Sequence, residues 1–386
     1  MVARKKQQRP QTTRRITMIQ SHGAKQARVT MGTHQIWQKT QDPNKHVIMH
    51  GPMSASKHIH PKTGMIIYVF GDYHWKKHAC RENPSHLDIS FTQAIEIAAR
   101  QHPDQILDVH LERKTFRHKM KTLDPTTVDY GQGFLFEDAT IGLSKKGYLR
   151  MSHNNVALSN LHVHSDDVRD TLSSEATFLG GLVWFALKQA GNFYTPTPSW
   201  QEFERWLSYI LKIMKDTHLY GPHHQFNAEK IFEETKINKQ IVKLPASETK
   251  LLKLLGRWKQ TYIQSVDYFN KHHAMEYLYE ILAIYGQMKG DPAQFPSRIE
   301  QLKQLVNGLL EITNQLVHQS VLQDIYMLAR LMKHSHRNNI VYVGDAHALK
   351  LREGLQELGF TQIYYHAHPQ EFQCIDLTAL HSWPLF

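Results

Sequence analysis

Cysteine is scarce in this sequence, and long apolar runs are missing. Cys80 and Cys374 are the two cysteines among 386 residues. Two widely spaced thiols make neither a disulfide framework nor a cysteine-type zinc site, so we expect inert thiols and a reducing compartment. No uninterrupted apolar run reaches the roughly 18 residues of a membrane span, and the basic first residues lack the apolar core of a secretory signal. These absences predict a non-secreted, cytoplasmic protein without a membrane span.

Acidic residues are absent from residues 1–41, whereas the whole chain has 46 Lys and Arg against 35 Asp and Glu, a net charge of +11. An acid-free basic stretch is typical of a flexible arm, which we place at residues 1–46. The excess of positive charge suggests that residues 1–41 contact nucleic acid or an anionic surface. A solvated tail is the simpler interpretation.

Several catalytic signatures are also absent. The sequence contains no Gly-x-x-x-x-Gly-Lys-Ser/Thr loop, no Gly-x-Gly-x-x-Gly, no Gly-x-Ser-x-Gly and no His-Glu-x-x-His. Kinases, dehydrogenases, α/β-hydrolases and zincins therefore lose their usual support. The composition, 41% apolar and 21% charged, is nevertheless that of a folded globular chain.

The pattern of apolar residues predicts an α/β fold. Strands are expected at Met65–Phe70 and Ile106–Leu111, with a helix at Ser90–Gln101 between them, and such a unit places its two strands in parallel. Further strands are expected at Gly133–Phe136, Leu161–His164, Asn339–Val343 and Thr361–Tyr365, and further helices at Ser173–Gln189 and at Leu349–Leu358, where Gly359 ends the helix.

Residues 199–334 look almost wholly helical, and the two prolines of Tyr194–Ser199 mark a boundary before them. Helices are expected at Trp200–Asp216, Ser247–Gln287 and Ser297–Lys333. We therefore divide the chain after its basic arm into a first α/β part at 47–198, an all-α insertion at 199–334, and a C-terminal α/β part at 335–386. The last part is expected to complete a mainly parallel sheet with flanking helices.

Two segments share one design, a strand followed by Gly-Asp-x-His. Gly71–His74 follows one strand, and Gly344–His347 follows another. In open α/β sheets, ligands bind beyond the carboxyl ends of parallel strands, so the two segments could converge on a metal or form an acid–base pair. Because 27 residues are histidine, ordinary loop histidines are the competing interpretation.

Two further groups of polar residues follow strands. Glu112 comes directly after Ile106–Leu111 and could face the same crevice, or could pair with a neighbouring cation. His164 would share one strand face with the histidine two residues before it, and Asp167 and Arg169 follow. Arginine with carboxylates suits either anion binding or the orientation of a catalytic group.

The order of these features resembles the TraB/PrgY, TIKI protease and erythromycin-esterase superfamily. Its most specific part here is Val341–Phe360, which contains Gly-Asp-Ala-His and ends in Leu-Gly-Phe. Asp324–Arg330 and the His-x-x-Asp-x-Arg of 164–169 also resemble uncharacterised proteins of large DNA viruses. The resemblance covers Met65–Leu111, Leu161–Arg169 and Asp324–Tyr365, and the middle matches only in being helical.

The resemblance implies a hydrolase, metal-dependent in TIKI-like members and metal-free in esterase-like members. Carried over to this sequence, His74, Glu112 and His347 would form the catalytic core or bind Mn, Zn, Co or Fe, and Arg169 would be a supporting cation. The other supporting residues would be Gly71, Asp72, Gly344, Asp345, His164, Asp167 and Asp324. The sequence departs from the family at two positions: Asp72 replaces a common Glu, and Asp345 replaces a small or apolar residue.

The leading hypothesis is a hydrolase that acts on a peptide, ester or related acyl bond. His74 and His347 would be metal ligands or general bases, and Glu112 would be a ligand or the base that activates water. The alternative is a non-catalytic basic interaction protein that keeps the fold, such as a virion component or a nucleic-acid-associated protein. A viral protein of this kind would be located in the host cytoplasm or the virion.

Overall fold

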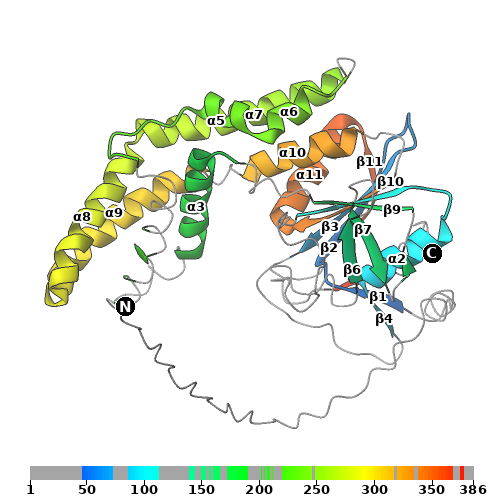
Figure 1. Cartoon of the computed structure of the whole chain (residues 1–386), viewed down its shortest axis with the longest axis horizontal. Coiled ribbons are helices and arrows are strands. Elements are labelled where there is room, and N and C mark those ends of the chain that lie inside the picture. Colours follow the sequence, from blue (N-terminus) through cyan, green and yellow to red (C-terminus); the bar gives the residue numbers. More distant parts are fainter. Residues whose placement is uncertain are drawn as a thin grey trace, which may run out of the picture.

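The computed structural model has the α/β architecture that the sequence predicts (Figure 1). Strands gather in one part of the molecule, and helices cover them and extend away to one side. The structure describes residues 46–72, 86–112, 139–143, 149–153, 156–157, 160–165, 172–189, 220–245, 248–316, 320–333, 338–367 and 374–377, together with helical positions 201, 204, 207, 208 and 211.

The main sheet has nine strands in the described part of the chain. Its spatial order is β11 (Thr361–Ala367), β2 (Ser54–Ile59), β3 (Ile66–Asp72), β10 (Asn338–Gly344), β5 (Leu107–Leu111), β9 (Leu161–Ser165), β7 (Leu149–His153) and β6 (Ala139–Leu143), and β8 (Val156–Ala157) pairs with β7. The central strands β3, β10, β5 and β9 are parallel, whereas the outer strands pair in antiparallel fashion. The predicted parallel arrangement of β3 and β5 is confirmed, with β10 lying between them.

A smaller sheet and one helix cover one face of the main sheet. The small sheet has the order β12 (Cys374–Asp376), β1 (His46–His50), β4 (His86–Ser90), and the helix is α2 (Phe91–Gln101). Their apolar side chains form one buried cluster with the aromatic and apolar side chains that β3 and β10 direct to this face. The strands β1, β4 and β12 were not predicted.

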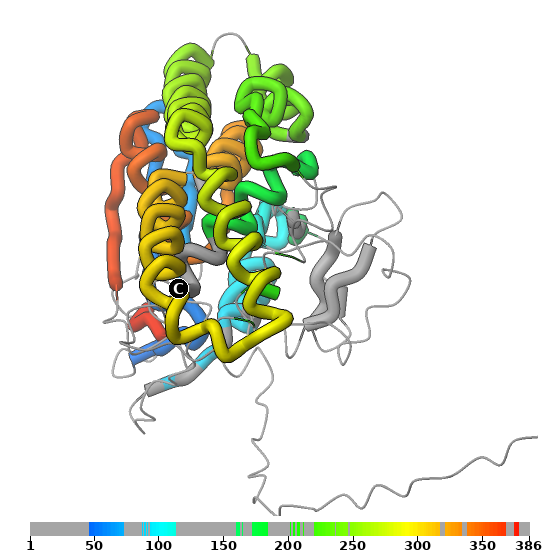
Figure 2. Tube along the Cα trace, turned by 90° about the vertical axis from the view of Figure 1, so that its left-hand side faces the viewer, coloured from blue at the N-terminus to red at the C-terminus, as the bar shows by residue number. Residues whose placement is uncertain are grey.

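Helices cover the opposite face. Between β9 and β10 the described residues form α3 (Ser174–Gln189), α5 (Ala228–Glu234), α6 (Lys236–Ile241), α7 (Thr249–Lys271), α8 (Ala274–Gly290), the 3-10 helix η2 (Pro292–Gln294), α9 (Phe295–Gln315) and α10 (Ser320–Met332), and α11 (Asp345–Leu358) follows β10. Their core is continuous with Ile67, Val69, Val341 and Val343 of the sheet. Figure 1 shows α10 and α11 next to the sheet and the α8–α9 pair extending away from it. Figure 2 shows β11 along one edge, beside α11.

Two of the long predicted helices are each divided. The helix expected at Ser247–Gln287 is α7 and α8, separated where His273 adopts the left-handed conformation with φ of 53°. The helix expected at Ser297–Lys333 is α9 and α10. Neither break carries the glycine or proline that sequence reasoning requires at a helix end. By contrast, Gly359 ends α11 with φ of 96°, as predicted.

Some predicted features lie outside the described residues. They are the basic arm, the strand at Gly133–Phe136, the boundary at Tyr194–Ser199 and most of the helix at Trp200–Asp216. Among the residues that are described, no helix has both the length and the apolar character that crossing a membrane requires.

Cys374 corrects the expectation of two inert thiols. This residue begins β12, is buried and is disulfide-bonded. Cys80, the other cysteine of the sequence, lies outside the described residues. Because disulfides persist mainly in oxidising compartments, the bond argues against the reducing compartment inferred from the low cysteine count.

The strand β2 is buried although its sequence is largely polar. Arg352 of α11, 4% exposed, donates from Nε to Ser56 Oγ (3.0 Å) and from Nη2 to Ser54 Oγ (2.6 Å). His58 is fully buried on the same strand, with Nε2 2.9 Å from Ser56 Oγ. Burial, and then the Arg352 charge, lower the pKa of His58 to about 4.

We predict that His58 makes the fold sensitive to acid between pH 6.5 and pH 4. The unfolded chain takes up a proton on this imidazole in that range and the folded chain does not, so stability is present above pH 6.5 and is lost as pH falls. At pH 5 the loss is about 2 kcal/mol. Denaturant unfolding of wild type and His58→Gln at pH 7 and pH 5 measures it.

The variant should lose less stability than wild type over that step. His223→Gln, at a side chain that is 84% exposed, is the matched control and should behave as wild type does. Equal losses in His58→Gln and wild type would show that other groups cause the acid sensitivity.

Candidate active site

The carboxyl ends of three parallel strands meet at one edge of the main sheet. Gly344 at the end of β10 lies opposite Asp72 at the end of β3, and Tyr342 lies opposite Leu111 of β5. The strands before the two Gly-Asp-x-His segments are therefore neighbours. His74 lies outside the described residues, so the structure places only the second histidine.

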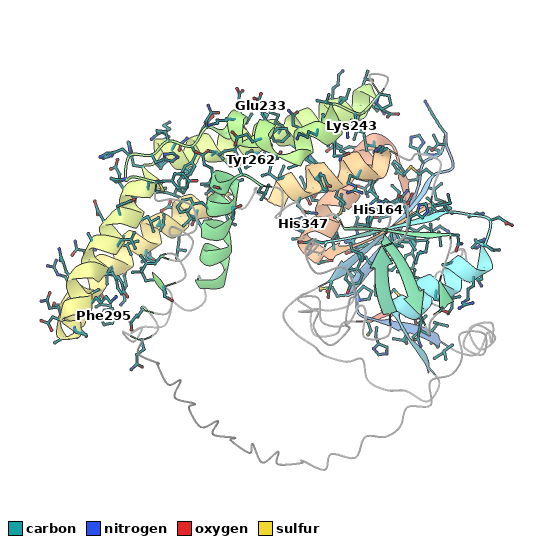
Figure 3. All side chains as sticks on the ribbon, in the orientation of Figure 1. His164, Glu233, Lys243, Tyr262, Phe295 and His347 are labelled. Atoms are coloured by element: carbon teal, nitrogen blue, oxygen red, sulfur yellow. The ribbon has the colours of Figure 1, made fainter. Side chains whose placement is uncertain are left out.

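His347 is held by a buried carboxylate. Its Nδ1 lies 2.7 Å from Oδ1 of Asp324, which comes from α10 and is 1% exposed. Figure 3 shows His347 near α10, at the side of the sheet that the helices cover. With Nδ1 donating to a carboxylate, the other ring nitrogen, Nε2, is left as the basic or metal-binding atom.

That second nitrogen faces Glu112, directly after β5. The distance from His347 Nε2 to Glu112 Oε1 is 3.6 Å, longer than a hydrogen bond, and the other carboxylate oxygen accepts the Gly344 backbone N–H at 2.9 Å. Gly344 is the N-cap of α11, so this hydrogen bond joins Glu112 to the N-terminal end of the helix. Three residues from β5, α10 and α11 thus form the series Asp324, His347, Glu112.

Asp324 is in an unfavourable place for a charge. Burial raises the pKa of its carboxyl group, and the nearby Glu112 charge acts in the same direction, whereas His347 and Lys350 oppose the shift. A carboxylate that is buried against one imidazole, at the end of parallel strands, is typical of an acid–base site.

A second polar group lies on the same face of the sheet, on β5 and β9. His164 of β9 has Nε2 2.8 Å from Asp108 Oδ1 and Nδ1 3.0 Å from Nη2 of Arg330 on α10. Because a guanidinium only donates, Nδ1 of His164 must accept and Nε2 must carry the proton that Asp108 receives. His162, on the same face as predicted, lies 3.5 Å from the same carboxylate oxygen.

Asp108 and His110 were missed by the sequence reasoning. Both are buried on β5. The His110 ring stacks on His164 with centroids 4.6 Å apart, and its Nε2 lies 3.1 Å from Asn339 Oδ1. The signal was present: Asp108, His110 and Glu112 occupy alternate positions and therefore share one face of an otherwise apolar strand.

The aspartates of the two motifs lie away from His347. Asp345 accepts a hydrogen bond from Ser54 Oγ and lies 3.8 Å from Arg352. The Asp72 carboxylate accepts a hydrogen bond from the Tyr342 hydroxyl on the opposite face of the sheet, where burial first, and then Asp72, raises the pKa of Tyr342. These contacts give both aspartates structural roles.

The first motif begins with glycine because Asp345 packs against it. A Cβ at Gly71 would overlap the Asp345 carboxylate and the Ser54 hydroxyl, and it would lie 3.1 Å from the Ala348 side chain. Glycine therefore allows α11 to start directly over the end of β3.

The residues predicted to bind a metal are brought together only in part. Glu112 Oε1 and His347 Nε2 converge, at a spacing that suits two ligand atoms each about 2.1 Å from one ion. In the described ranges, no group of three or more His, Cys, Asp or Glu side chains is arranged to hold a metal ion. His74, Asp167 and Arg169 lie outside those ranges.

Known proteins do not identify the chain. Comparisons with protein-family models, with curated proteins and with solved structures gave no significant match. The resemblance to the TraB, TIKI and esterase superfamily therefore rests on the quoted motifs alone.

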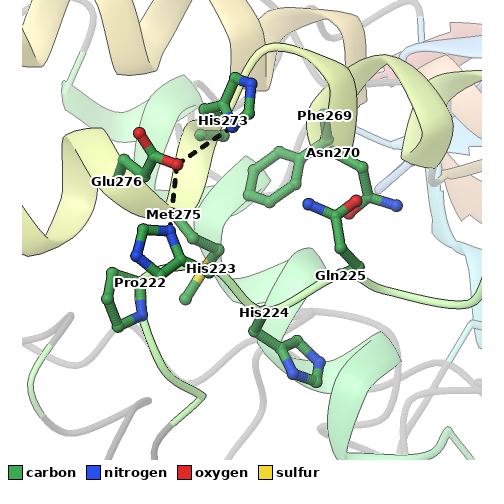
Figure 4. Close-up of a pocket in the computed structure, with 10 residues that line it drawn as sticks. Pro222, His223, His224, Gln225, Phe269, Asn270, His273, Met275 and Glu276 are labelled. Carbon is green, nitrogen blue, oxygen red and sulfur yellow. Dashed lines mark hydrogen bonds and ion pairs between the residues drawn. The ribbon is translucent and has the colours of Figure 1, made fainter.

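A separate hollow lies in the helical part, where α7 meets α8 (Figure 4). Glu276 Oε1 lies 3.2 Å from His223 Nδ1 and 3.0 Å from His273 Nδ1 on its rim. The His223 and His273 side chains are 84% and 63% exposed, so solvent screens these ion pairs and they contribute little. The hollow shares no residue with the site at the strand ends.

We predict that Gly71→Ala destabilises the protein by about 1–3 kcal/mol, the usual cost of adding atoms to a packed site. The added methyl group must displace Asp345 or Ser54. Denaturant unfolding measures the loss. Gly256→Ala on α7, where a Cβ meets nothing within 4 Å, is the control and should be neutral or slightly stabilising; a neutral Gly71→Ala would contradict the close approach.

We predict that Asp324→Asn does not lower stability at neutral pH. The folded chain holds the Asp324 proton more tightly than the unfolded chain, so wild type loses stability as pH rises above about 4. The amide avoids this cost and can still accept from His347 Nδ1. Unfolding free energies from pH 4 to pH 8 should show that the stability of the variant rises relative to that of wild type as pH rises. A variant whose stability falls relative to wild type over this range would contradict the prediction.

Proposed function

We propose that this protein is a hydrolase that cleaves an ester, peptide or related acyl bond at the carboxyl edge of its parallel strands. The observation that supports the proposal is the series Asp324–His347–Glu112. It combines a buried orienting carboxylate, an imidazole held through Nδ1, and a second carboxylate 3.6 Å from the Nε2 of that imidazole.

In the proposed reaction, His347 Nε2 removes a proton from water as the water oxygen attacks the acyl carbon. Asp324 keeps Nδ1 protonated and stabilises the imidazolium that forms. Glu112 Oε1 accepts the second water hydrogen and so helps to position the water. The imidazolium then returns its proton to the leaving alkoxide or amine, and the acyl group departs as a carboxylic acid.

The polar group beside the site supports the same interpretation. His164 pairs in register with His110, two residues before Glu112, and Arg330 of α10 donates to its Nδ1, which leaves the Nε2 proton directed to Asp108. By the resemblance, His74 and Arg169 would complete the site. The helices between β9 and β10 are then one insertion that supplies Asp324 to an α/β enzyme.

A divalent ion would be held by Glu112 and His347, with His74 as the third predicted ligand. Manganese, zinc, cobalt or iron bound there would lower the pKa of a coordinated water molecule. Asp324 would then have the orienting role that carboxylates commonly have toward a metal-binding histidine. In this case His347 is a ligand and not the base.

The test is hydrolysis of 4-nitrophenyl esters with acyl chains of two to eight carbons and of a fluorogenic peptide by the purified full-length chain. We expect His347→Gln and Glu112→Gln to lower kcat/KM at least about 100-fold, and Asp324→Asn to lower it by about 100-fold to 10,000-fold. His223→Gln, in the distant hollow, should retain wild-type activity. No hydrolysis of any probe, or full activity in His347→Gln, would overturn the proposal.

Metal content of the same samples decides between the two roles of His347. Elemental mass spectrometry is applied to wild type, His347→Gln and Glu112→Gln. Near-stoichiometric metal that both variants lose, with activity that a chelator abolishes and one ion restores, assigns both residues as ligands. Activity that survives the chelator assigns His347 as the general base.

A further inference from the structure

The positive charge of the chain is concentrated in two short segments. Residues 1–41 have nine Lys and Arg and no acidic residue, and residues 236–260 have seven Lys and Arg against Glu248 alone. The remaining 320 residues have 30 basic and 34 acidic residues, so their net charge is −4. Of these two segments, the structure describes most of the second, which spans α6 and the first half of α7.

Four lysines of this segment lie on α6, just after it, and at the start of α7. Lys239, Lys243, Lys250 and Lys253 are all exposed, and in the described part of the chain none of them is in an ion pair. They have the spacings i,i+4 and i,i+3, which place each pair on one side of its helix or helix end. Figure 3 labels Lys243 beside α6 and α7. Two other cations are already engaged: Arg257 pairs with Glu357, and Lys259 lies over the Phe232 ring.

The apolar side chains of the same helices are not available to a lipid surface. Leu251, Leu254, Leu255 and Trp258 are buried in the protein core, whereas helices that lie on membranes use a continuous apolar face for insertion. Val242, 77% exposed, is a single side chain. The surface offers charge with little apolar area, which is the requirement for contact with a phosphate backbone.

We propose that Lys239, Lys243, Lys250 and Lys253 form a binding surface for the phosphate backbone of nucleic acid, independent of base sequence. The four ammonium groups replace counterions along the duplex, and the release of these counterions drives binding. The acid-free residues 1–41 would add to the same electrostatic attraction. The surface is distinct from the site at the strand ends and does not depend on the proposed hydrolysis.

The test measures binding of the full-length chain to a fluorescent 20-base-pair DNA duplex by anisotropy, from 50 to 200 mM NaCl. In one variant the four lysines become Gln. In the matched control Lys62, Lys271, Lys289 and Lys333, also exposed, become Gln, so both variants lose the same charge. We expect the first variant to bind at least about tenfold more weakly at 100 mM salt, with a salt slope smaller by about 3–4.

The control variant should bind within about threefold of wild type. Equal weakening of both variants would show a dependence on net charge alone and overturn the proposal, as would binding that persists unchanged in the four-lysine variant. Binding to phosphatidylserine vesicles without binding to DNA would assign the surface to membranes instead. An unchanged melting temperature for each variant ensures that a loss of binding is not a loss of fold.

Discussion

The structure depends on the position of β10, which lies between β3 and β5 and pairs in parallel with both. This pairing sets the register in which Gly344 meets Asp72, and so it fixes where α11 begins. The Gly344 N–H can then reach Glu112, 232 residues earlier in the sequence. A site that joins the end of β5 to the start of α11 exists only because this strand occupies the centre of the sheet.

One short motif serves two purposes because of helix geometry. Asp345 and His347 are two residues apart in α11, and a rotation of about 200° directs them to opposite sides of the helix. Asp345 meets Ser54 and Arg352, which fastens the helix to β2. His347 meets Asp324, whose burial disfavours its own charge. One residue anchors the helix, and the other would carry the proposed chemistry.

Sequence reasoning found the elements whose cause is local. The apolar run of β3, the helix α2 and the glycine that ends α11 can each be predicted from their own residues. It missed β2, whose polar residues are buried because Arg352 covers them, and the break at His273, which no glycine or proline marks. Glu112, Asp324 and His347 were candidates by type, but their pairing depends on how α10 packs over the sheet, and spacing along the chain does not contain that information.

The central place of β10 also orders the folding of the chain. Strands β3 and β5 are complete by residue 111, but their shared neighbour begins at residue 338. During synthesis both strands therefore present unpaired edges while more than 200 residues are added. The helices made in that interval can form early, because the hydrogen bonds within a helix are local. Closure of the sheet must come last, so a chain truncated before residue 338 would expose the very edges that promote aggregation.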